Sequence, residues 1–282
     1  MELSLTVLTD DTKSPDNIFA GEFGLSFFLE TGGKKILFDT GYSDVFLANA
    51  GIMGINVGNL DYVVLSHGHN DHTGGLIPLS RYLAEKRDGA GTGKVPELIA
   101  HTRCLYPKPK GQDPNTGSIL SEDEVKQTFS TNLSDKPVWI TDDLVFLGEI
   151  PRRFPYERTE PGDRRIIFPD GSVKPDLLLD DSALAFRSGA GLVILSGCSH
   201  AGISNIAEYA LEVCEERMVT DIIGGLHLLS PEPERLARTG KYLNRLHLKA
   251  LHVCHCTSAD ARVTLADYCP VEEAGVGMRF RW

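Results

Sequence analysis

Three histidines and one aspartate lie within six positions of the stretch SHGHNDHTGGL, which directly follows the apolar run DYVVL. Imidazole and carboxylate groups are ligands of zinc, manganese and iron. His67 and His69 are two positions apart, so both can face one ion if the backbone turns between them. Asp71 and His72 are then placed to bind a second ion. The spacing therefore predicts a metal site, and four ligand-type residues this close together disfavour the alternative, a loop of surface histidines.

The glycines of this stretch are expected to shape its backbone. Gly68 provides the conformational freedom for the turn between the two histidines. Thr73-Gly74-Gly75 is expected to open a helix that extends to about Lys86, with apolar residues recurring near one face. Free amide groups and the helix dipole favour an anion at a helix N-terminus. The start of this helix is therefore expected to face the metal site.

Three further histidines follow segments that read as strands. His200 follows GLVILSGCS, His227 follows VTDIIGGL and His255 follows ALHVC. All three are candidate metal ligands, and His255 is alternatively a contact to substrate. The competing interpretation for each is a histidine packed at the end of a strand.

Extended and helical segments mix along the chain in an order typical of a layered α/β protein. The strand-like segments are LSLTVLT, GLSFFLE, KKILFDT, DYVVLSH, PVWITDDLVFLGEI, ALAFRS, GLVILSG, VTDIIGG and ALHVCH. Helices are expected at AGISNIAEYALEVCEER and near 232–247. His247 lies in this last helical pattern and His252 in the last strand, and both are interpreted as structural.

Two irregular stretches, residues 103–137 and 151–176, are expected to be insertions that close over the site and determine the substrate. The first contains one short helix around SEDEVKQTF, with Ser121 as its N-cap. The second is rich in arginine, and guanidinium groups match phosphate bidentately. An anion clamp is therefore one hypothesis and a solvated basic loop the other for Arg152, Arg153 and Arg158, together with Arg164 and Arg165.

The composition is that of an ordinary globular protein with a formal net charge of −11 over 282 residues. This acidic balance argues against a dedicated nucleic-acid binder, which needs clustered Lys and Arg. The N-terminal residues lack the features of a signal peptide, and no run approaches the ~18 apolar residues that cross a bilayer. A cytoplasmic protein without a membrane partner is expected, and its six cysteines are not expected to form a disulfide framework.

The motif SHGHNDHTGG resembles the His-x-His-x-Asp-His signature of the metallo-β-lactamase superfamily of metal-dependent hydrolases. The upstream ILFDTG is similar to that superfamily's first motif, whose aspartate, here Asp39, orients the metal centre from behind. The resemblance implies an α/β fold of the four-layer αβ/βα sandwich type, with metals at one edge between the halves. It implies one domain over residues 1–282 that contains both insertions, and two divalent metal ions, zinc first, with manganese or iron as alternatives.

The later motifs depart from the superfamily's usual pattern. Cys198 replaces an aspartate that normally bridges the ions, and it is expected beside the ligands. Asp181 lies near the place of the usual midway histidine and is an additional candidate ligand. His101 matches no ligand position of the family, and Cys256, next to His255, is left open. The resemblance therefore leaves the outer part of the metal site undecided.

The combination of SHGHNDHTGGL, LSGCSHAGISNI, IGGLHLL and HVCHCTS resembles the branch related to dihydropterin-6-methyl-ribofuranosylaminobenzene-phosphate synthases. The resemblance implies metal-activated water acting on a small anionic substrate that bears a phosphate or ester, with Asp71 orienting the water or relaying its proton. Two alternatives remain: a pterin-type transferase in which an aromatic amine displaces pyrophosphate, and a catalytically silent metal-bound sensor. The expected partner is a small-molecule substrate, and a homo-oligomer is left open.

Overall fold

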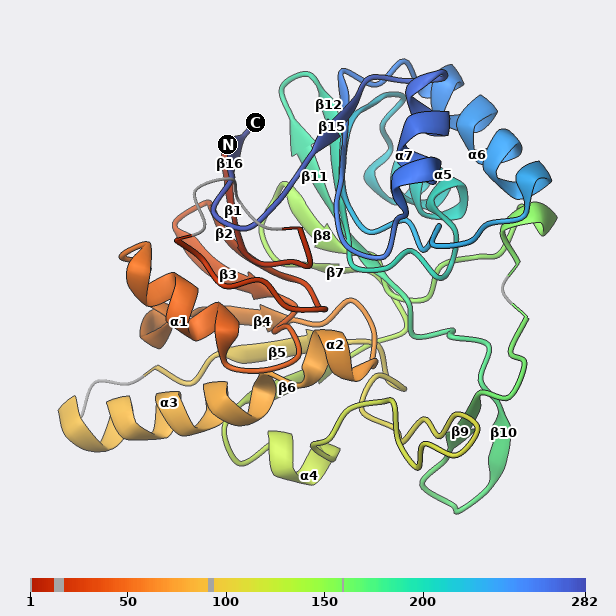
Figure 1. The fold of residues 1–282 in the computed structure, drawn as a ribbon. Helices are drawn as coiled ribbons and strands as arrows, with labels where there is room; N and C mark the ends of the chain where they lie inside the picture. The colour runs from red at the N-terminus through yellow and green to blue at the C-terminus, as the bar shows by residue number, and fades with distance from the viewer. Residues whose placement is uncertain (1, 13–17, 91–93, 159) are drawn as a thin grey trace.

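Two large β-sheets lie face to face in the computed structural model, which describes residues 2–12, 18–90, 94–158 and 160–282 (Figure 1). The first sheet contains, in spatial order, β16 (Arg279–Arg281), β1 (Leu3–Thr9), β2 (Ser26–Thr31), β3 (Lys34–Phe38), β4 (Tyr62–Val64), β5 (Glu97–Ala100) and β6 (Ser130–Leu133). The second contains β15 (Val271–Glu273), β14 (Ala250–Val253), β13 (Val219–Gly224), β12 (Gly191–Ser196), β11 (Ala183–Ser188), β8 (Leu144–Phe146) and β7 (Val138–Trp139).

Helices cover the outer face of each sheet. The first sheet is covered by α1 (Val45–Ile52) and α3 (Leu76–Ala90), and the second by α5 (Ile203–Cys214), α6 (Pro233–Leu246) and α7 (Ala259–Ala266). Shorter elements are α2 (Asn70–Thr73), α4 (Glu122–Val125) and the 3₁₀ turns η1 (Val57–Asn59) and η2 (Pro155–Glu157). A separate hairpin of β9 (Arg165–Ile167) and β10 (Val173–Pro175) lies away from both sheets (Figure 1).

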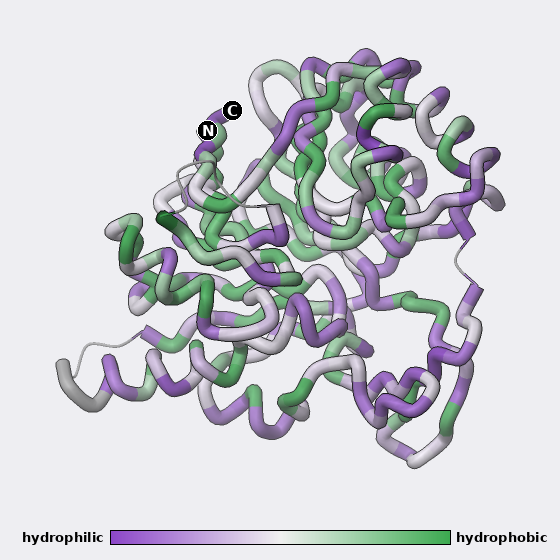
Figure 2. The backbone as a smooth tube through the Cα atoms, viewed as in Figure 1, coloured by the Kyte–Doolittle hydropathy of each residue, from purple (hydrophilic) through white to green (hydrophobic). Residues whose placement is uncertain are grey.

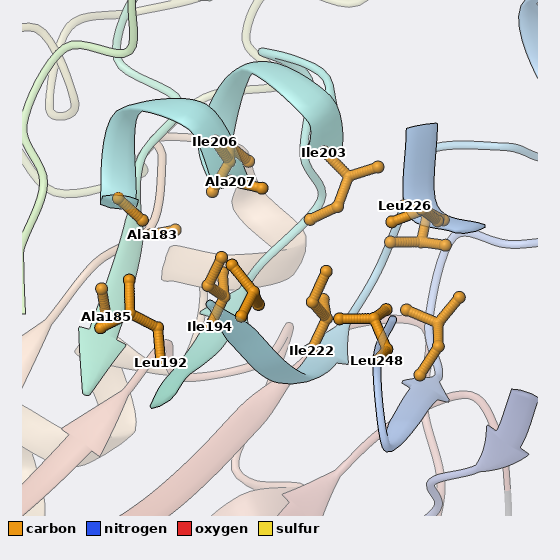
Figure 3. Close-up of a cluster of buried hydrophobic side chains, with 14 of the residues drawn as sticks. Ala183, Ala185, Leu192, Ile194, Ile203, Ile206, Ala207, Ile222, Leu226 and Leu248 are labelled. Carbon is orange, nitrogen blue, oxygen red and sulfur yellow. The ribbon is translucent and has the colours of Figure 1, made fainter. Parts of the chain in front are cut away.

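Alternate residues of the central strands pack against opposite layers. In β3, Ile36 and Phe38 lie between the two sheets, whereas Leu37 packs on the side of α1 and α3. In β12, Leu195 lies between the sheets and Ile194 packs against α5 (Figure 3). Strands buried on both faces need apolar side chains in both directions. The continuous runs KILF and GLVIL, and the hydrophobic centre of the backbone tube in Figure 2, follow from this layering.

The carboxyl ends of several strands lie at one edge of the sandwich. Strands β3, β4 and β5 are parallel in the first sheet, as are β12, β13 and β14 in the second. Strand β1 has the same direction as β3, because both are antiparallel to β2. Loops that leave these ends therefore meet between the sheets.

The structure confirms the mixed α/β fold class with two large sheets, and the predicted strands and main helices are present. The short helix is α4, where Ser121 forms a capping box with Glu124. The helix expected after Thr73 is α3, and a separate short helix, α2, precedes it. Two expectations were wrong in detail. Residues 130–133 are not part of an irregular insertion, because β6 pairs in parallel with β5. The second insertion contains the β9–β10 hairpin.

No helix within the described part of the chain is both long and apolar enough to cross a bilayer.

Candidate metal centre

Seven candidate ligands lie around one cavity edge, each after a strand of one of the two sheets or in α2. The first sheet supplies four of them in the loop after β4 and in α2, and the second supplies three after β12, β13 and β14: His67, His69, Asp71, His72, His200, His227 and His255. Residues far apart in the sequence thus approach one another because the parallel strands end at the same edge.

Three imidazoles form the first group of donors. His67, His69 and His200 each offer a ring nitrogen, and these atoms lie within 4.8 Å of one another. His67 Nε2 is 3.0 Å from His69 Nδ1, and the His200 ring centroid is 4.8 Å from both other centroids. The backbone turn between the first two histidines passes the carbonyl of Cys104 so closely that a Cβ on Gly68 would lie 1.9 Å from its oxygen. Glycine is therefore needed here for close approach rather than for an unusual φ.

A second group combines a carboxylate, a thiol and two imidazoles. Asp71 Oδ2 lies 3.5 Å from His72 Nε2 and 3.3 Å from His255 Nε2. The two Nε2 atoms are 3.2 Å apart, and Cys198 Sγ is 3.2 Å from His72 Nε2. Cys198 therefore lies among the donor atoms rather than behind them.

Cys198 also belongs to a third set of converging donors. Its sulfur, a ring nitrogen of His200 and one of His227 lie within 4.8 Å of one another. The rings of His200 and His227 are 4.1 Å apart. Cys198 thus lies between the three-imidazole group and the carboxylate-containing group, where a bridging residue would be placed.

Asp39 and Ser66 set the tautomers of two histidines. Asp39 Oδ2 lies 2.7 Å from His72 Nδ1, so this nitrogen carries the proton and Nε2 presents its lone pair to the second group. Ser66 Oγ donates to the same carboxylate at 2.6 Å and lies 3.0 Å from His67 Nδ1. The serine oxygen therefore accepts a hydrogen bond from His67 Nδ1. This leaves Nε2 of His67 unprotonated, so its lone pair can bind a metal ion.

Asp10, which the sequence interpretation did not single out, holds the loop after β14. Its carboxylate lies at the end of β1, is fully buried and accepts a hydrogen bond from the backbone N–H of His255 at 2.8 Å. The signal was present in the sequence, because an aspartate directly follows the apolar strand LSLTVLT. Burial is the largest influence on this carboxyl and raises its pKa to about 7.

Several residues at the site have a left-handed backbone conformation that non-glycine residues rarely adopt. Asp39, Ser199, His227 and His255 have φ values between 42° and 58°. Such conformations are maintained only where the surrounding structure fixes them, and they occur preferentially at functional sites. The hydrogen bonds to the backbone of these loops are therefore part of how the donors are positioned.

Asp180 and Asp181 each hold one of the ligand loops. Asp180 accepts from the backbone N–H of Gly68 at 2.8 Å, and Asp181 accepts from the N–H of Ala201 at 2.8 Å. Asp181 is outside every donor group found among the described residues, so its contacts are those of a loop anchor. Burial raises its pKa to about 6. Asp180 is itself paired with buried Lys108 at 2.8 Å.

None of the three arginines predicted as an anion clamp, Arg152, Arg153 and Arg158, lines the cavity at the donor groups. Arg152 donates to the backbone carbonyls of His200 and Leu178. Arg153 pairs with Glu212 on the surface, and Arg158 is largely exposed beside Glu160. These side chains are engaged by neighbouring backbone and surface carboxylates.

The remaining histidines lie outside the donor groups formed by the described residues. His101 is buried and lies 3.4 Å from Glu149, with its Nδ1 accepting from the N–H of Arg103. His252 lies between Asp221 and Glu272, and exposed His247 ends α6.

Burial suppresses the charge of the three-imidazole group. It lowers the pKa of His67 and His200 well below the usual range, with further lowering by neighbouring imidazoles, and that of His69 to about 3. Burial also opposes protonation of His255, but neighbouring Cys256 and Asp71 outweigh it and raise the pKa to about 9. The first group therefore consists of neutral donors, and in the second the Asp71 carboxylate faces imidazoles whose pKa it raises.

A cavity of about 260 Å³ opens over these donors. Five of the donor residues line it: His69, Asp71, Cys198, His200 and His227. Its remaining lining consists of Phe23, Asn70, Lys110, Thr116, Arg164, Leu229 and Cys256. The cavity therefore combines metal-ligand chemistry with an apolar and a cationic wall.

Comparisons with known proteins show which proteins this chain is similar to. The chain matches the model of the metallo-beta-lactamase superfamily over residues 20–209. It is 30% identical over 272 residues to the 7,8-dihydropterin-6-methyl-4-(beta-D-ribofuranosyl)-aminobenzene-5'-phosphate synthase of Methanocaldococcus jannaschii, covering 92% of this chain and 89% of that protein. An uncharacterized protein of the same organism is 29% identical, covering 93% of each chain.

Solved structures show the same similarity. Tm1679, described as a metal-dependent hydrolase of the beta-lactamase superfamily, has a TM-score of 0.83 and 29% identity, covering 99% of this chain and 98% of its own. A diphosphatase from the PhnP family has a TM-score of 0.57 and 17% identity, covering 100% of this chain and 98% of its own, and shares the fold.

Proposed function

Because this chain is an enzyme of the metallo-β-lactamase superfamily, we propose that it is a metal-dependent hydrolase of a small anionic substrate. The observation that carries this proposal is the convergence of imidazole, carboxylate and thiol donors on one cavity. A small molecule is the proposed partner rather than a nucleic acid or a membrane, which suits a cavity of about 260 Å³ in a chain of net charge −11. A cytoplasmic location is part of the same proposal.

The donor set fits two divalent ions. Tetrahedral zinc with Zn–N bonds of about 2.0–2.1 Å requires donor atoms about 3.3–3.4 Å apart. In the first group His67 Nε2 lies 3.0 Å from His69 Nδ1, and in the second His72 Nε2 lies 3.2 Å from His255 Nε2. One ion would be held by the three-imidazole group and the other by Asp71, His72, Cys198 and His255, with His227 as a further ligand beside Cys198. Thiolate and imidazole together favour zinc over manganese or iron.

When bound, ions at such a site lower the pKa of water from ~15.7 toward ~7 and neutralise developing negative charge. The residues of the chain supply orientation and proton handling. Burial opposes ionisation of Asp71, but His72 and His255 outweigh it and lower the pKa of this carboxyl. Asp71 also lines the cavity, so its ionised oxygen can accept a hydrogen bond from a water and receive its proton.

A screen of esters, thioesters and phosphodiesters with Zn²⁺, Mn²⁺ and Fe²⁺ tests the proposal. Turnover should require added metal, fall to background in His67→Ala and His69→Ala, and persist in His247→Ala. The last variant is the matched control, because His247 is exposed at the end of α6. Turnover that survives in His67→Ala would contradict the proposal. Metal binding without any turnover would instead favour the sensor hypothesis.

A second candidate function is pterin-type transfer, favoured by the 30% identity to a synthase over most of both chains. In that reaction the amine nitrogen forms a bond to the pterin methyl carbon, and the bond from that carbon to pyrophosphate breaks. Incubation with a dihydropterin pyrophosphate, with and without an aminobenzoate-type amine, separates the two reactions. Pyrophosphate release only in the presence of the amine indicates transfer, whereas release with water alone indicates hydrolysis.

A further inference from the structure

Two cationic residues line the cavity that contains the donor groups. Lys110 belongs to the first insertion and Arg164 to the second, and both line the same cavity as His69 and His200. They were not distinguished by the sequence, where Arg164 was one of five arginines in an irregular stretch and Lys110 carried no signal. Only the fold places a cation from each insertion beside the metal ligands.

The backbone holds these two residues next to each other. Lys110 and Arg164 are partners in an antiparallel bridge. The adjacent N–H of Arg165 donates to the carbonyl of Pro109 at 2.9 Å, and the N–H of Ile167 donates to that of Pro107 at 3.0 Å. The first insertion thus adds an extended segment to the β9–β10 hairpin. The two cations are therefore fixed by a small sheet rather than carried on independent loops.

A buried ion cluster anchors this small sheet to the metal centre. Lys108, two residues before Lys110, is 1% exposed and lies 3.3 Å from Asp176 and 2.8 Å from Asp180. Asp180 in turn accepts from the N–H of Gly68 in the His67–His69 turn. On the other side, the N–H of Asn70 donates to the carbonyl of Thr116 at 2.9 Å. The position of the cationic wall relative to the metal ligands is therefore set by direct contacts.

The charges of Lys110 and Arg164 are not neutralised within the described chain. No carboxylate of the described residues lies within 4 Å of either cationic group, although many other cations of the protein are paired. The Arg164 guanidinium has one long contact, 3.4 Å, to the carbonyl of Glu160. A guanidinium and an ammonium together suit a dianionic phosphate, the first bidentately and the second as a point charge.

Two other residues that line the cavity offer apolar surface. Phe23 and Leu229 line the cavity and are 55% and 50% exposed, and the Phe23 ring lies 5.1 Å from that of His255. Both are large apolar side chains left in contact with solvent at the mouth of a polar site. An aromatic or aliphatic part of a ligand would cover them.

We propose that Lys110 and Arg164 form a phosphate-binding wall, so that the substrate carries a phosphate group joined to an apolar body. This inference rests on the proposed function, because it concerns the substrate of the same cavity. The phosphate is bound at the wall as a recognition group, and Phe23 and Leu229 contact the apolar body. The bond that reacts then lies between them, over the metal ligands.

Calorimetric titration of the zinc-loaded protein with phenylphosphonate, a dianion that carries a ring and no hydrolysable ester, tests this wall at about 0.15 M salt, where distant surface charges are screened. The double variant Lys110→Gln/Arg164→Gln should bind the probe about tenfold or more weakly than the wild type, because hydrogen bonds to charged groups are lost. Zinc content and thermal unfolding should match those of the wild type.

The matched control is Arg103→Gln/Lys174→Gln, which removes one cation from each insertion as well. These two side chains lie over the ring of Phe168, outside the metal cavity. The control should retain wild-type affinity. Equal affinity of the wild type and the Lys110→Gln/Arg164→Gln variant would overturn the proposal, as would tighter binding of phenylacetate than of phenylphosphonate, since that would indicate a carboxylate site.

Failure of this inference and failure of the proposed function are distinguishable. If only the phosphate wall is wrong, metal-dependent turnover requires His67, but the affinity for phenylphosphonate is the same with and without Lys110 and Arg164. If only hydrolysis is wrong, no turnover is found while phosphonate affinity still depends on both cations.

Discussion

The substitution Asp39→Asn should weaken metal binding at both donor groups although neither group contains Asp39. In the wild type, Asp39 Oδ2 accepts from His72 Nδ1 and from Ser66 Oγ, and Ser66 Oγ accepts from His67 Nδ1. The amide that replaces this oxygen is a donor. His72 then has to carry its proton on Nε2, and the reoriented serine hydroxyl donates to His67 Nδ1, which has the same effect on that ring.

The expected loss follows from the number of rings that change tautomer. Removing an outer hydrogen-bond partner of a metal-bound histidine typically reduces metal affinity 10–100-fold, which corresponds to about 1.4–2.8 kcal/mol. Each donor group contains one affected ring, so the metal affinity of both groups should fall by a factor in this range. In the wild type the backbone N–H of Ser66 donates to Asp39 Oδ1 at 2.7 Å. The asparagine carbonyl can accept the same hydrogen bond, so the loop itself should remain folded.

Competition with a chromophoric zinc chelator measures both affinities and the stoichiometry. Asp61→Asn is a suitable control, because Asp61 also accepts a backbone N–H, that of Lys35, but lies away from the donor groups. The reasoning is refuted if Asp39→Asn binds two zinc ions as tightly as the wild type. Loss at only one group would show that the Ser66 hydroxyl does not transmit the change to His67.

Three further predictions address the thiol, the buried cation and a buried carboxyl. Cobalt-substituted protein should show sulfur-to-cobalt charge-transfer absorption that disappears in Cys198→Ser but persists in Cys269→Ser, and its presence in both would exclude Cys198 as a ligand. Lys108→Met should lower the free energy of unfolding in urea by about 3–5 kcal/mol, because it leaves buried carboxylates unpaired, and a change below about 1 kcal/mol would contradict the buried ion cluster. Burial raises the pKa of Asp181 to about 6 from 3.8, so the folded state binds this proton more tightly than the unfolded state and stability falls as pH rises between these values. In zinc-free protein, the unfolding free energy of Asp181→Asn minus that of the wild type should therefore increase by up to about 3 kcal/mol as the pH rises from 4 to 6.5. Parallel pH profiles of the two proteins would exclude this coupling.

The sequence was most informative where the chemistry is local. SHGHNDHTGGL contains four ligand-type residues within one turn, and the structure brings all four to the same cavity edge. The layered α/β class was accessible for a similar reason, because strands buried on both faces form continuous apolar runs, whereas the sandwich type followed from the resemblance to the superfamily. Helix α1, VFLANAGI, was missed because it is apolar nearly all round, and β15 and β16 because three residues give no period.

Contacts between distant segments could not be predicted in this way. Asp10 and His255 are 245 positions apart in the sequence. They come into contact only because β1 and β14, which lie in different sheets, both end at the same edge of the sandwich. The arginines illustrate the converse, since their abundance in one stretch predicted an anion clamp at Arg152, Arg153 and Arg158. The structure assigns these side chains to backbone carbonyls and surface carboxylates. Composition identifies a charged segment, but the fold decides which charge faces the cavity.

The aspartates around the cavity suggest why an acidic protein would bind cations here strongly. Asp39, Asp180 and Asp181 are fully or almost fully buried, and their carboxylates accept hydrogen bonds from the loops that carry the donors. Burying a carboxylate is costly unless charge or hydrogen bonds compensate. Divalent ions bound by the donor groups would add to the compensation that these hydrogen bonds supply, and would also fix the left-handed turns at His227 and His255. Metal binding and the ordering of these loops should therefore be thermodynamically linked.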